Sequence, residues 1–137
     1  MVCTWSLLAV DLDGTLLTTD GTVSAASRTA LEQLDAAGVE VLFATGRCRN
    51  ETLAVLADVE YEGPIIVAGG AMLVDSCSGH TLDRKTIDPD IVKRIVMHFH
   101  DEGHVSLVLK DHHAAGYDYL LVGTHELHPI SSWWMKF

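Results

Sequence analysis

A short apolar run, residues 6–10, leads directly into two aspartates that are separated by one residue and followed by a glycine. In an extended chain, successive side chains point to opposite faces, so Asp11 and Asp13 lie on one side and Leu12 points into the core. Two carboxylates this close repel each other, which costs stability unless a cation or a catalytic task compensates. Ligands of open α/β sheets bind at the carboxyl ends of the strands. The pattern therefore favours a Mg²⁺-dependent phosphotransfer site with an aspartate nucleophile; a solvated turn or a calcium loop is the alternative.

Strands and helices are expected to alternate through the first half of the chain. Three apolar runs without polar alternation are typical of parallel strands covered on both faces; they are residues 5–10, 39–45 and 65–68. Helical spacing of apolar side chains predicts one helix that opens at Thr22 or Ser24 and stops at Gly38, and a second over residues 50–59. This order predicts an α/β fold with a Rossmann-like, doubly wound parallel sheet.

The rhythm of the sequence changes after Gly69 and Gly70. Residues 71–74 and 81–86 flank a turn-rich stretch, which predicts a β-hairpin. The second half of the chain is then predicted to hold one helix and two strands, at residues 88–103, 104–109 and 117–122. We therefore expect two domains: an incomplete Rossmann-like core over residues 1–86, and the start of an α+β cap over residues 87–137.

The charge balance limits the partners that this chain can have. Nine Lys and Arg face nineteen Asp and Glu among 137 residues, a formal net charge of −10. Nucleic acids and anionic membranes both reward basic patches, so neither is an expected partner. No apolar stretch approaches the roughly 20 residues that a membrane helix needs. The first ten residues carry no Lys or Arg, which argues against a secretory signal. We expect a cytoplasmic protein.

Two motifs at strand ends resemble those of a known superfamily. Residues 11–17, which read DLDGTLL, resemble the first motif of the haloacid dehalogenase superfamily, and Thr45-Gly46-Arg47 resembles the second. The hairpin after Gly70 and the unit beyond it resemble the Cof-type phosphatases, whose cap is inserted after the third strand. The resemblance covers nearly the whole chain, and it implies hydrolysis of small phosphorylated metabolites.

The resemblance assigns chemical roles to the two aspartates. Asp11 would attack phosphorus and form an aspartyl phosphate. Asp13 would protonate the leaving alcohol and then deprotonate the hydrolytic water. Mg²⁺ would be held by Asp11 and Asp13, the latter through its backbone carbonyl.

Four further residues make up the predicted substrate- and phosphate-binding set: Leu12, Thr45, Gly46 and Arg47. The Thr45 hydroxyl and the Gly46 amide would donate to phosphoryl oxygens. Arg47 would pair with the substrate or with a carboxylate of the cap. Leu12 leaves the site apolar behind the nucleophile.

Two elements of the family pattern are missing from this sequence. One is a lysine that follows the cap, and the other is a Gly-Asp loop whose acid completes the Mg²⁺ sphere; no Gly-Asp dipeptide occurs here, and the chain ends at Phe137. We therefore expect a truncated form, weak or inactive alone, with strand 5–10 at an exposed sheet edge through which chains can self-associate. The alternatives are a non-catalytic fragment that pairs with another chain through this edge, and a phosphomutase or phosphotransferase of the same superfamily.

Overall fold

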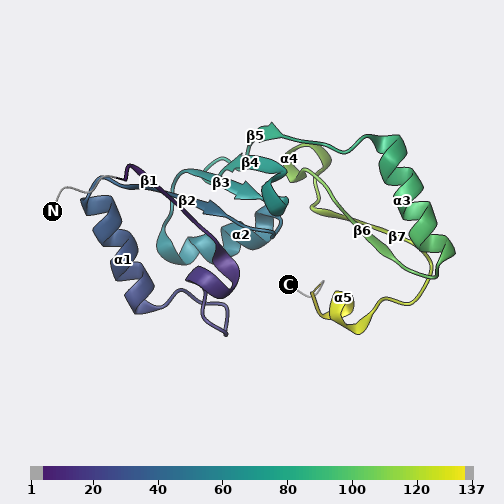
Figure 1. Ribbon diagram of the computed structural model, residues 1–137, viewed down its shortest axis with the longest axis horizontal. Helices are drawn as coiled ribbons and strands as arrows, with labels where there is room; N and C mark the ends of the chain where they lie inside the picture. Colours follow the sequence, from purple (N-terminus) through teal and green to yellow (C-terminus); the bar gives the residue numbers. More distant parts are fainter. Residues whose placement is uncertain (1–4, 135–137) are drawn as a thin grey trace. The chain divides into compact units, whose positions relative to one another are not determined.

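The computed structural model describes residues 5–134, which divide into two compact units between Arg84 and Lys85 (Figure 1). Phe137 lies outside the described residues. None of the helices described is long and apolar enough to cross a membrane.

The first unit is built on a five-stranded sheet whose strands follow the order β1-β2-β3-β4-β5. Strands β1 (Leu7–Val10), β2 (Glu40–Ala44) and β3 (Pro64–Val67) run parallel. The hairpin of β4 (Met72–Asp75) and β5 (Thr81–Arg84) adds antiparallel strands beyond β3. The predicted α/β class is confirmed. The sheet is mixed rather than wholly parallel because the hairpin extends it.

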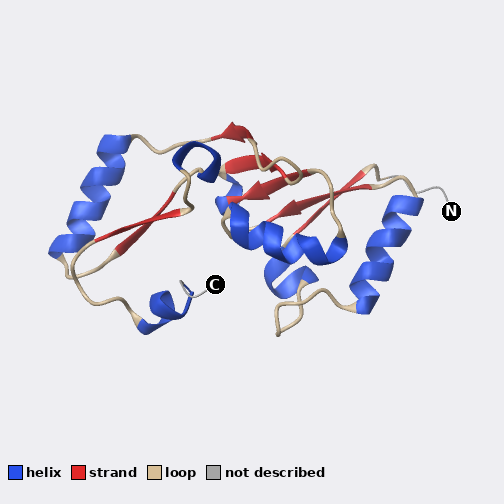
Figure 2. Cartoon of the chain, turned by 180° about the vertical axis from the view of Figure 1, so that it is seen from behind, coloured by secondary structure: helices blue, strands red, loops and turns tan. Residues whose placement is uncertain are grey.

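Helices α1 (Ala25–Ala36) and α2 (Arg49–Leu56) connect the parallel strands (Figure 2). A short turn of helix, Ala57–Val59, extends α2. Ser24 begins α1, because its hydroxyl accepts a hydrogen bond from the Ser27 amide at 3.0 Å. At the start of α2 the cap comes from inside the helix: the Glu51 carboxylate reaches back and accepts a hydrogen bond from the Cys48 amide at 3.0 Å.

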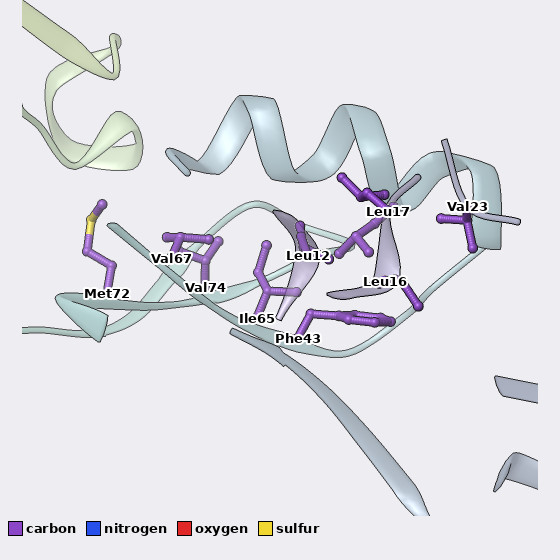
Figure 3. Packing of buried hydrophobic residues seen from close by; sticks show 10 residues of the cluster. Leu12, Leu16, Leu17, Val23, Phe43, Ile65, Val67, Met72 and Val74 are labelled. Carbon is purple, nitrogen blue, oxygen red and sulfur yellow. The ribbon is translucent and has the colours of Figure 1, made fainter. Parts of the chain in front are cut away.

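The core of the first unit joins the sheet to the turn that follows β1. Its fully buried apolar side chains include Leu12, Phe43, Ile65, Val67 and Val74, which pack together in Figure 3. Four of these come from the sheet, while Leu12 comes from the turn after β1. The apolar side chain between the two aspartates thus ties their turn to the sheet.

The second unit contains a small antiparallel sheet, β6 (Ser106–Leu109) with β7 (Tyr119–Val122). Its helices are α3 (Pro89–Asp101), α4 (His112–Ala115) and α5 (Pro129–Trp134). The short α4 was not predicted from the sequence. No side chain described in this unit is buried, so it has α+β elements without an enclosed core of its own.

Strand β1 lies at one edge of the five-stranded sheet. It pairs with β2 alone among the described strands. Leu7 is 48% exposed and Leu8 41% exposed. The predicted edge position of this strand is confirmed, and it exposes both apolar side chains and backbone groups.

Candidate active site

The two sequence motifs meet because they follow neighbouring parallel strands. Val10 of β1 is opposite Phe43 of β2, so the residues that follow both strands lie together at the carboxyl ends of the parallel strands. Asp11 thus lies at the end of β1, and Thr45 lies at the end of β2. Open α/β proteins bind their ligands at these carboxyl ends of the strands.

The first motif folds into a tight turn that holds both aspartates at the surface. The Leu12 amide donates to Asp11 Oδ1 at 2.8 Å, and the Leu17 amide donates to the Leu12 carbonyl at 2.9 Å. Gly14 adopts a left-handed φ of 74°, which favours glycine. Leu12 is fully buried while Asp11 and Asp13 are exposed, as the alternation predicted. Because the Leu12 side chain is buried in the core, only the backbone of Leu12 can take the predicted part in phosphate binding.

The second motif is anchored by hydrogen bonds on both sides. The Thr45 amide donates to the Ile66 carbonyl at 2.9 Å, and the Gly69 amide donates to the Thr45 carbonyl at 3.1 Å. The Thr45 hydroxyl accepts from the Arg47 amide at 3.2 Å. Thr45 is buried, whereas Gly46 is exposed. The threonine is therefore a fixed part of the turn, and the glycine leaves the backbone open to a ligand.

Arg47 binds the Asp13 carboxylate through two hydrogen bonds from its guanidinium. Arg47 Nε donates to Asp13 Oδ2 at 2.9 Å, and Arg47 Nη2 donates to Asp13 Oδ1 at 2.7 Å. This hydrogen-bonded contact lowers the pKa of Asp13 below its ordinary value and raises the pKa of Arg47. Both groups are therefore ionised in this arrangement at neutral pH.

This ion pair was missed by the sequence analysis, which expected Arg47 to pair with the substrate or a cap carboxylate. The two residues are 34 positions apart. A usable signal existed, because both follow neighbouring parallel strands and carry opposite charges.

The oxygen donors at the site fit a hard cation through Asp11. Mg²⁺ is commonly held by one or two carboxylates together with waters and substrate phosphate oxygens, which suits an exposed aspartate at a strand end. Asp13 gives both side-chain oxygens to Arg47, so its backbone carbonyl is the donor that fits. Within the described part of the chain, no group of three or more His, Cys, Asp or Glu residues is arranged to hold a metal ion.

Comparison with known proteins identifies the family to which this fold and site belong. The family model described as haloacid dehalogenase-like hydrolase matches residues 8–131. The chain belongs to this family, as its motifs predicted. The predicted placement among Cof-type members is likewise confirmed.

Curated relatives of this chain are phosphatases. The HMP-PP phosphatase of Serratia proteamaculans is 30% identical over 139 residues, a match that covers 90% of this chain and 50% of the relative. The 5-amino-6-(5-phospho-D-ribitylamino)uracil phosphatase YwtE of Bacillus subtilis is 38% identical over 80 residues, covering 58% of this chain and 27% of the relative. The chain thus spans half or less of the length of these relatives.

A solved structure supports the same fold. The haloacid dehalogenase-like hydrolase from B. subtilis superposes with a TM-score of 0.68 and 31% sequence identity, covering 76% of this chain and 36% of that structure. The chain is therefore a distant homologue of haloacid dehalogenase-like phosphatases, and it is short relative to them.

Proposed function

We propose that this protein is a Mg²⁺-dependent phosphatase of small phosphorylated metabolites that works through an aspartyl phosphate, and that it acts in the cytoplasm. The observation that carries the proposal is the convergence of Asp11, Asp13 and Thr45 at the ends of β1 and β2. The phosphatase names of the relatives support the reaction class.

Asp11 is the proposed nucleophile. One of its carboxylate oxygens bonds to phosphorus while the bond from phosphorus to the substrate oxygen breaks. Once its contact with Arg47 is broken, Asp13 takes up a proton from solvent and passes it to the departing oxygen, which yields an alcohol. Asp13, now ionised, takes a proton from water, whose oxygen attacks phosphorus, releases phosphate and restores Asp11.

The residues after β2 are the proposed phosphate-binding set. The Gly46 amide lies in the exposed part of the turn, where it can donate to a phosphoryl oxygen. The Thr45 hydroxyl, held against the Arg47 amide, supplies a second donor. The Leu12 backbone joins Asp11 to Asp13 in the turn after β1. Arg47 pairs with the negative charge of the substrate.

Asp11 and Asp13 would hold Mg²⁺, the first through its carboxylate and the second through its backbone carbonyl. When bound, the ion supplies positive charge that lets an anionic nucleophile approach an anionic phosphoryl group.

The test is phosphate release from p-nitrophenyl phosphate, measured with and without Mg²⁺. We expect slow release by the wild-type chain and a loss of at least about a hundredfold in Asp11→Asn, because the amide is a far weaker nucleophile than the carboxylate. Asp35→Asn, which removes another exposed carboxylate, this one from α1, is the matched control and should retain the wild-type rate. Equal rates in wild type and Asp11→Asn would refute the proposed nucleophile.

The exposed edge of β1 favours a second candidate function. An edge strand with exposed leucines is a template for pairing with another chain. A non-catalytic chain that pairs through this edge predicts a folded protein with no Mg²⁺-dependent phosphate release at all. The same assay therefore separates the two candidates.

A further inference from the structure

The contact between Arg47 and Asp13 occupies the groups that the proposed reaction needs. Both carboxylate oxygens of Asp13 accept hydrogen bonds from the same guanidinium, at 2.9 and 2.7 Å. While this contact lasts, each oxygen has one lone pair engaged by the guanidinium, so the arginine competes with a leaving group for Asp13. The side of the guanidinium formed by Nε and Nη2 is also occupied, and its planar fork suits phosphate as well as carboxylate.

The backbone of Arg47 is held by hydrogen bonds, while its side chain ends in a partly exposed ion pair. Its amide donates to the Thr45 hydroxyl at 3.2 Å, and its carbonyl accepts from the Ala68 amide at 2.8 Å. The ion pair itself lies at the surface, with 27% of the Arg47 side chain and 59% of the Asp13 side chain exposed. A ligand beside Thr45 can therefore reach the guanidinium without any change in the backbone.

We propose that Arg47 alternates between two anions: it chelates Asp13 in the arrangement seen here, and it transfers its guanidinium to the phosphoryl group when substrate binds, which releases Asp13 toward the leaving oxygen. This inference rests on the proposed function, because it requires phosphate to bind beside Asp11 and Thr45. Asp13 is then an internal competitor of the substrate for a single arginine.

Competition predicts how phosphate affinity responds to removal of either partner. Asp13→Asn keeps the shape of the side chain but removes the charge that holds Arg47, so the arginine becomes available to phosphate. Exposed ion pairs are weak, so we expect the affinity to rise by about threefold to fivefold. Arg47→Met keeps the aliphatic length of the side chain and removes the guanidinium, which should weaken phosphate binding.

The experiment is a double-mutant cycle on the full chain, with inorganic phosphate as the probe and Mg²⁺ in every sample. The dissociation constant is measured by calorimetry for wild type, Asp13→Asn, Arg47→Met and the double variant. Asp20→Asn, an exposed aspartate beyond the same motif, is the control for general loss of negative charge. We expect Asp13→Asn to tighten binding only where Arg47 is present, and Asp20→Asn to change it less.

A second measurement needs no variant and so does not depend on how the variants fold. The ¹⁵N signal of Arg47 Nε in the wild-type chain should shift as phosphate is added, because the group exchanges its acceptor. If phosphate binds but this signal stays unchanged and Asp13→Asn acts equally in both backgrounds, the exchange is refuted and the phosphate site stands. If phosphate binds to none of the four proteins, the proposed phosphate site itself fails, and the exchange with it.

Discussion

Leu12 links the chemistry of the site to the stability of the fold. It lies between the two aspartates, yet its side chain is fully buried against Phe43 and Ile65 in the core (Figure 3). Because side chains alternate between the two faces of an extended chain, burying Leu12 in the core also turns Asp11 and Asp13 toward the surface. The spacing of the motif is therefore explained by packing as well as by catalysis.

Truncation of this residue should damage folding and function together. Leu12→Ala leaves a cavity in the core, for which we expect a loss of about 2–5 kcal/mol in the free energy of unfolding. The measurement is urea unfolding followed by circular dichroism. Leu8→Ala is the matched control, because Leu8 is 41% exposed on the neighbouring strand and should cost much less. Equal losses in the two variants would contradict the anchoring role of Leu12.

At the scale of elements, α1 depends on its ends more than on its packing. None of its residues is fully buried, although Leu31 packs partly against the core. Burial of a helix face normally supplies most of its stability, so a helix with a weakly buried face relies more on its capping.

Loss of the cap should therefore be measurable. Ser24→Ala removes the acceptor of the Ser27 amide, and we expect a loss of about 1 kcal/mol in the free energy of unfolding. Ser24→Asp keeps a capping oxygen and should retain nearly all of the stability. Thermal unfolding of the three proteins side by side checks this. A Ser24→Asp protein as unstable as Ser24→Ala would show that the hydrogen bond is not the cause.

Elements that rest on local pattern could be predicted from the sequence, while the contacts between them could not. The strand before Asp11 and the helix opened by Asp88 and Pro89 follow from apolar runs and capping residues that are neighbours in the chain. The pairing of Arg47 with Asp13 depends on the register of two strands, and also on the fact that Arg47 binds Asp13 rather than another carboxylate near it, such as Glu51. The four-residue helix α4 has too few residues for a periodic signal.

For the whole molecule, the exposed edge of β1 bears on how chains meet. We expect the wild-type protein to self-associate through this edge at high concentration. Leu8→Lys places a charge on the strand and should shift the protein toward monomer, because charged side chains protect natural edge strands. Sedimentation velocity measures the change. Ile91→Lys, which removes an apolar side chain that is 48% exposed from helix α3 instead of a strand, should leave the association unchanged.

The position of β1 also affects how firmly the proposed nucleophile is held in place. A strand held by one neighbour opens at lower free energy than a strand held by two, and such local opening precedes global unfolding. Asp11 directly follows β1, so each opening of that strand carries the proposed nucleophile away from Thr45. We therefore expect the proposed site to open with the four-residue ladder between β1 and β2, before the fold as a whole unfolds.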